Sequence, residues 1–205
     1  ELLENAFDVL PGNTNGNREE VRYVGGNSCQ KRDLEQAHVL LGMEGISFTD
    51  EEFHAHSVFS TLLGGGMSSR LFQEIREKRG LAYTIYSYLQ CYKDAGLFGV
   101  YAGTAKDDVA DLVPLIREEI EKLSQAIPES EIDRARTQIK AGLLMSLEST
   151  SSRCEQVARQ TMIFGHPLTF NEVVAKIEAV DEAALNRAAE RLLVGKPTLT
   201  TLGPA

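Results

Sequence analysis

Arg76 and Tyr83 are the two side chains of this sequence whose types and spacing most suggest chemistry. Arg76 falls in the second half of a predicted helix and Tyr83 opens the strand predicted after it, with Gly80 between them. A chain reversal at Gly80 would bring the phenol back towards the guanidinium. Because a guanidinium offers five N–H donors and a phenol one more, the pair could hold a peptide carbonyl or stabilise a tetrahedral oxyanion. From spacing alone, an Arg on a solvated helix face and a Tyr at a sheet edge remain the simpler interpretation.

The four histidines are the next candidates, because neutral imidazole is a common metal ligand. His54 and His56 would point about 200° apart on a helix. Two ligands on one helical face require an i, i+4 spacing, as in H-x-x-E-H, and that motif is absent from the chain. We interpret His54 and His56 as solvated or core-edge residues and His38 and His166 as structural or surface residues. No metal ligand and no cofactor-binding residue is predicted.

The run Gly64-Gly65-Gly66 could be a phosphate loop or a hinge. No Lys follows it at the spacing of a P-loop, and Ser69 stands where a dinucleotide motif needs its last Gly. An anion at the N-terminus of the following helix stays open as an alternative. We favour a flexible hinge between two helices.

Composition and charge exclude several classes of protein. The formal net charge is -9, which argues against a nucleic-acid partner. No apolar run approaches the roughly 20 residues that a membrane span needs. We expect a soluble protein, with cytoplasm and periplasm both open as its compartment. Cys29, Cys91 and Cys154 lie far apart with no C-x-x-C pair, so three separate, partly buried thiols are expected.

The elements that must position Arg76 and Tyr83 follow from periodicity and capping signals. A Thr49–Glu52 capping box starts a helix that ends in a left-handed cap at the glycines. Ser68 or Ser69 caps the next helix, which buries its apolar side and stops at Gly80. Strands are predicted at 21–26, 39–41, 82–92, 97–104 and 198–203.

Five further helices are predicted between the hairpin of residues 82–104 and the last strand. The first carries apolar residues from Val109 to Leu123 and the second from Ile132 to Leu147. The other three are entered at Ser152, at Thr169 with Glu172, and at Asp181. Because strands come in adjacent pairs, the order predicts an α+β fold, an antiparallel sheet with helices on one face, and disfavours a doubly wound nucleotide fold.

The stretch LLGGGMSSRLFQEIREKRGLAYTIYS, with DLEQAHVLLGMEG before it and GLFGVYAGTA and AGLLMSLESTSSRCEQVARQ after it, carries a family resemblance. It closely resembles the C-terminal half of pitrilysin/insulinase-family zinc peptidases, among the bacterial homologues of mitochondrial processing peptidase. The resemblance covers residues 20–205, which it implies are one C-terminal domain without the zinc motif. Residues 1–19 are then a linker or the tail of a preceding half.

The resemblance implies a function for this half. In the family, an N-terminal half binds zinc through H-x-x-E-H and a distal Glu. The matching Arg and Tyr of the other half, here Arg76 and Tyr83, contact the substrate near the scissile carbonyl. The chain is therefore expected to be the substrate-binding, non-metal-binding half of a zinc metalloendopeptidase, inactive alone.

The implied partners are the zinc-binding half, fused or separate, and an unfolded peptide, with a second copy of the chain as a further candidate. The alternative is a non-catalytic scaffold or partner subunit with the same peptidase fold.

Overall fold

The computed structural model describes residues 2 and 21–204 of the chain. The strands are β1 (Asn27–Lys31), β2 (Ala37–Glu44), β3 (Thr84–Cys91), β4 (Gly96–Thr104) and β5 (Thr198–Gly203). The helices are α2 (Phe53–Gly64), η1 (Phe72–Glu77), η2 (Lys106–Asp108), α3 (Val109–Leu123), α4 (Glu129–Ser146), α5 (Thr150–Phe164), α6 (Phe170–Glu178) and α7 (Glu182–Leu193). The predicted tail, residues 1–19, lies outside the described residues except for Leu2.

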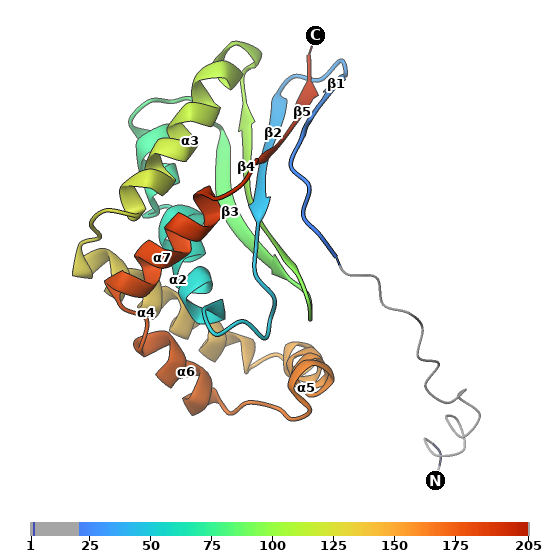
Figure 1. The fold of residues 1–205 in the computed structure, drawn as a ribbon, viewed down its shortest axis with the longest axis vertical. Helices are drawn as coiled ribbons and strands as arrows, with labels where there is room; N and C mark the ends of the chain where they lie inside the picture. The colour runs from blue at the N-terminus through green and yellow to red at the C-terminus, as the bar shows by residue number, and fades with distance from the viewer. Residues whose placement is uncertain (1, 3–20, 205) are drawn as a thin grey trace.

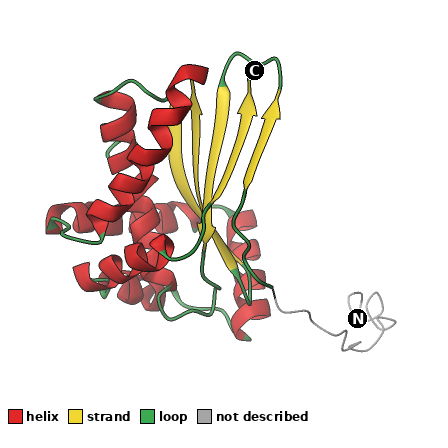
Figure 2. Cartoon of the chain, turned by 45° about the horizontal axis from the view of Figure 1, so that its top comes forward, coloured by secondary structure: helices red, strands yellow, loops and turns green. Residues whose placement is uncertain are grey.

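The five strands form one mixed sheet in the order β1-β5-β2-β4-β3. The pairs β2–β4, β2–β5 and β3–β4 are antiparallel, as predicted, whereas β1 pairs with β5 in parallel. Figures 1 and 2 show the sheet as one layer and helices α2, α3, α4 and α7 as a second layer on one side of it. Helix α5 stands apart, near the tip of the β3–β4 hairpin. The α+β class and the one-sided helix layer predicted from the sequence are thus confirmed.

The core lies between the sheet and α2. Val39 and Leu41 of β2, with Phe98 and Val100 of β4, alternate along their strands and are buried on the helix side. Phe59 of α2 meets Phe98 edge-on, with ring centroids 5.8 Å apart. Each such side chain contributes about 1.5–3 kcal/mol by leaving water, so this cluster fixes the orientation of α2 on the sheet.

The first strand is not where the sequence placed it. Residues 21–26 are irregular, and pairing starts at Asn27. A Cβ on Gly25 would stand 1.8 Å from the carbonyl oxygen of Lys196, so the chain first passes close to the connection between α7 and β5. The Gly26 carbonyl then accepts a hydrogen bond from Leu199 N–H at 2.8 Å, and β1 continues from there.

Two predicted helix signals at the ends of α2 are wrong. The Thr49–Glu52 capping box does not form. Glu52 N–H donates to the Asp50 carboxylate at 2.9 Å, and the Glu52 carboxylate pairs with Arg187. The cap after α2, Gly65, has φ -82° and is not left-handed.

The N-termini of α5, α6 and α7 can be compared with the three helix starts predicted at Ser152, Thr169 and Asp181. Helix α5 is capped by Ser149, whose side chain accepts from Ser152 N–H, so it begins before the predicted Ser152. The Thr169–Glu172 capping box of α6 and the Asp181 cap of α7 are confirmed. Within the described part of the chain, no helix combines the length and the apolar character that crossing a bilayer takes.

Candidate functional site

Arg76 projects from η1, which is a π-helix and not the predicted α-helix. Its apolar side packs as predicted, because Leu71 and Ile75 are fully buried and fix the helix to the core. The Arg76 guanidinium lies over the Phe72 ring, with Cζ 4.5 Å from the ring centroid. Arg76 is therefore exposed but held in place by a cation–π contact on its own helix.

The charges next to Arg76 on this helix are already engaged with one another. Glu74 pairs with Lys78 at 2.5 Å and with Arg79 at 3.4 Å. The hydrogen bond from Lys78, with those charges, lowers the pKa of the Glu74 carboxyl. Among the described residues no carboxylate pairs with Arg76. Its guanidinium N–H groups are thus left for another acceptor.

Gly80 reverses the chain between Arg76 and Tyr83. Its φ of 66° lies in the left-handed region that favours Gly, and its N–H donates to the Arg76 carbonyl at 3.0 Å. Tyr83 N–H donates to the Gly103 carbonyl at 2.8 Å, which fixes the start of β3 on β4. The Tyr83 side chain is 59% exposed. Both predicted side chains are accessible on anchored elements joined by one tight turn, and their described contacts do not include one another.

The triple glycine connects α2 to η1. A Cβ on Gly64 would stand 2.3 Å from the Ser87 backbone nitrogen, and one on Gly65 would stand 2.6 Å from Thr61 Cα. Gly66 has φ 153°. The run is thus a helix–helix connection, as the hinge interpretation states, and its first glycine also allows α2 to pack closely on β3. Ser69 does not cap the next helix, because its hydroxyl donates to the Gly66 carbonyl at 2.6 Å.

The four imidazoles lie in four different environments. His38 Nδ1 contacts the Tyr101 hydroxyl at 2.8 Å on the open face of the sheet. His56 is fully buried, and its Nδ1 lies 3.2 Å from the Glu52 carbonyl oxygen. His54, two residues earlier in α2, is half-buried, and His166 is exposed. Zinc needs three or four converging ligands, and the described residues hold no group of three such side chains. The residues that the structure describes, 2 and 21–204, therefore do not fit a zinc ion.

The cysteines differ from the prediction in exposure. Cys29 and Cys154 are exposed and only Cys91 is buried. The three are free and separate, as predicted. The expectation that all three are partly buried is wrong because Cys29 lies on an edge strand and Cys154 on α5, which buries none of its residues.

An aromatic row on the sheet face away from the helices was not singled out from the sequence. Tyr86 lies 5.2 Å from Tyr101 and 6.3 Å from Tyr88, centroid to centroid, and Tyr101 contacts His38. Leu40 is 37% exposed on the same face. The signal was the two-residue spacing of Tyr86 and Tyr88 in a strand whose alternate residue, Ile85, is buried.

Comparison with known proteins assigns the chain to a family. The family model described as the peptidase M16 inactive domain matches residues 1–139. The chain belongs to the peptidase M16 inactive-domain family. The resemblance to the C-terminal half of an M16-type zinc peptidase is thereby confirmed.

Relatives of this M16 domain are named as zinc proteases. It is 39% identical over 188 residues to an uncharacterized zinc protease of Streptomyces coelicolor, covering 91% of the chain and 41% of the relative. It is 36% identical over 202 residues to an uncharacterized zinc protease of Rickettsia bellii, covering 98% of the chain and 49% of the relative. The chain thus spans about half the length of the curated relatives it matches.

A solved structure shares the fold of this M16 domain. A conserved protein from Enterococcus faecalis superposes with a TM-score of 0.79 at 25% identity, covering 91% of the chain and 44% of that protein. The one-sided α+β layer is therefore present in a longer protein whose remaining length the chain does not match.

Proposed function

We propose that this chain is the substrate-binding half of a zinc metalloendopeptidase and works opposite a second half that holds the zinc ligands. The observation that carries the proposal is membership of the M16 inactive-domain family by a chain that matches about half of proteins named zinc proteases. Residues 20–205 would be the domain and residues 1–19 the linker or the tail of the zinc half. The second half could be fused to this chain or a separate subunit.

Arg76 and Tyr83 are proposed to hold the substrate. Both side chains are exposed, both backbones are anchored, and the neighbouring carboxylate Glu74 is occupied by Lys78 and Arg79. Because the guanidinium and phenol are donors without a competing internal acceptor among the described groups, they are suited to a peptide carbonyl and to the oxyanion that forms on it.

The open face of the sheet supports pairing with another half. Leu40 and Tyr86 are 37% and 43% exposed on a face that no described helix covers. Apolar and aromatic side chains gathered on one face are typical of an interface. We propose that the zinc-binding half covers part of this face, while the end of the sheet that carries Tyr83 stays accessible to a peptide.

Zinc in the parent enzyme would lower the pKa of a bound water and polarise the scissile carbonyl. Those ligands would come from the other half. Arg76 and Tyr83 would bind and orient the peptide carbonyl, and their donors would stabilise its developing negative charge. The chain alone is accordingly proposed to be proteolytically inert.

Substitution in the reconstituted two-half enzyme tests this proposal. We expect Arg76→Ala and Tyr83→Phe each to lower kcat/KM by about 10²–10³, the loss typical of an oxyanion donor, with zinc content unchanged. Arg134→Ala and Tyr92→Phe are matched controls, because Arg134 is an exposed arginine of α4 without an ion pair among the described residues and Tyr92 is another exposed phenol. Full activity in both test variants would contradict the proposal and favour the non-catalytic scaffold.

A further inference from the structure

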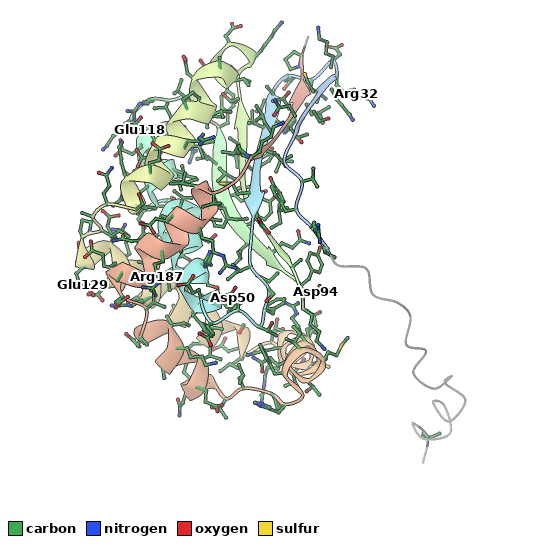
Figure 3. The ribbon with its side chains drawn as sticks, in the orientation of Figure 1. Arg32, Asp50, Asp94, Glu118, Glu129 and Arg187 are labelled. Atoms are coloured by element: carbon green, nitrogen blue, oxygen red, sulfur yellow. The ribbon has the colours of Figure 1, made fainter. Side chains whose placement is uncertain are left out.

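A cavity of about 820 Å³ lies between α5 and the surface formed by the start of α2, α6 and α7. Its volume is in the range of small-molecule sites, which is about 300–1,000 Å³. Asp50 and Arg187, labelled in Figure 3, both line it. None of its lining residues belongs to η1 or β3, so it is separate from Arg76 and Tyr83.

The walls of the cavity are largely apolar. Phe48 and Phe53 lie with ring centroids 5.3 Å apart on one wall, and Ile163 and Phe164 of α5 line the opposite one. Val173 of α6 also lines the space. Because α5 has no buried residue, this space separates α5 from the body of the domain. An apolar ligand body would give these side chains the contacts they lack.

Some of the charges at the cavity are already neutralised. Arg187 pairs with Glu52 at 2.8 Å, and Asp50 pairs with Arg191 at 2.9 Å. Arg159 of α5 and Lys176 of α6 also line the cavity, and neither forms an ion pair with a described residue. The cavity therefore holds two cations and two carboxylates, Glu51 and Glu155, without an ion-pair partner among the described residues. The charge of Lys176 also acts on the Glu172 carboxyl one helical turn earlier.

The corner formed by His54 and Lys176 is positive. The His54 ring packs edge-on against Phe53 with centroids 5.2 Å apart and is half-buried. Burial lowers the pKa of His54, and the charge of Lys176 lowers it further. Glu51 and Glu155 line the cavity too, yet the charge that acts on His54 is that of Lys176.

We propose that this cavity binds a small amphipathic anion, with its apolar body between α5 and Phe53 and its acidic group at Lys176 and His54. The site does not depend on the proposed peptidase role. A charge-assisted contact to an ammonium favours an acid over a neutral group of the same length, so the apolar wall sets the affinity and Lys176 selects the head group.

Calorimetric titration of the 205-residue chain with octanoate and with 1-octanol tests the proposal. We expect saturable binding of octanoate, and binding of 1-octanol about tenfold weaker. Lys176→Gln should weaken octanoate about tenfold and leave 1-octanol unchanged, since one charge-assisted contact is lost. Lys106→Gln is the control, because Lys106 is exposed, unpaired among the described residues and outside the cavity.

A substitution that fills the cavity tests whether the apolar body of the ligand binds there. Ala184→Phe, at a half-buried cavity position, should abolish binding of both ligands, and Gln156→Trp repeats the test from the α5 wall if Ala184→Phe melts early. Absence of saturable octanoate binding would overturn the proposal. So would equal affinity for octanoate in Lys176→Gln and the unaltered chain, or unchanged binding in a folded cavity-filling variant.

Discussion

Gly64 of α2 lies so close to Ser87 of β3 that an added Cβ would stand 2.3 Å from the Ser87 backbone nitrogen. The two elements are joined at the same place by the Ser87 hydroxyl, which donates to the Ser60 carbonyl at 2.7 Å. Because β3 follows Tyr83 directly, this contact helps to set where the strand with the proposed substrate-binding phenol begins.

Gly64→Ala should therefore destabilise the domain. The clash is with backbone, which cannot move aside cheaply, so we expect a loss of about 1–3 kcal/mol in the free energy of unfolding. Gly142→Ala is the matched control, because nothing lies within 4 Å of a Cβ there and Ala is favoured over Gly inside a helix. Urea unfolding followed by circular dichroism measures both. Equal stability of the two variants would contradict the close packing.

Cys29 and Cys154 should react faster with a thiol reagent than Cys91. Burial raises the pKa of the Cys91 thiol to about 11, so almost none of it is thiolate at pH 8, whereas Cys29 and Cys154 are exposed. In the folded chain, Ellman's reagent should react rapidly with two thiols and only slowly with the third. In urea, which unfolds the chain, all three should react rapidly. Three equally fast thiols would show that Cys91 is accessible.

Stability should fall as the pH drops below neutral. Burial lowers the pKa of His56 below its ordinary value of 6.5, with Arg191 acting in the same direction and Glu52 and Asp50 opposing. Between the lowered value and 6.5 the unfolded chain binds the proton more readily, so the free energy of unfolding decreases as pH falls through that window.

Urea unfolding at intervals from about pH 8 to pH 5 measures this dependence. His56→Asn should show a shallower slope than the unaltered chain. His54→Asn, measured alongside, removes the contribution of the other histidine whose pKa is lowered. A slope unchanged in His56→Asn would contradict the prediction.

Asp181→Ala should cost α7 its N-cap. The Asp181 carboxylate accepts from Ala184 N–H at 2.8 Å, and loss of such a cap costs about 1 kcal/mol. Glu121→Ala, an exposed and unpaired acid on α3, is the control and should change the free energy of unfolding by less than about 0.5 kcal/mol. Thermal melting of both variants gives the comparison, and equal melting temperatures would argue against the cap.

Strong periodicity made much of the fold predictable. The continuous apolar run Val39-Leu40-Leu41 predicts a buried strand, and Val39 and Leu41 are indeed buried in β2. The strand β1, with all five residues exposed, carries no such signal, and its parallel pairing with β5 depends on a partner far along the chain. Pairing between distant edges cannot be read from local periodicity.

Long-range contacts also explain the failed capping box at α2. Glu52 has the right spacing from Thr49, but its carboxylate is taken by Arg187 and Arg191 from α7. For the candidate site, the sequence could predict that Arg76 and Tyr83 flank a turn. It could not predict the cavity, whose walls come from segments that meet only in the folded domain.

The parallel pairing of β1 with β5 has a consequence for biosynthesis. Asn27 lies opposite Leu199, and β5 also sits between β1 and β2 in the sheet. While a ribosome is still adding residues before Thr198, the first strand has no neighbour and one edge of β2 is bare. The five-stranded sheet can therefore be completed only after the last strand has left the exit tunnel.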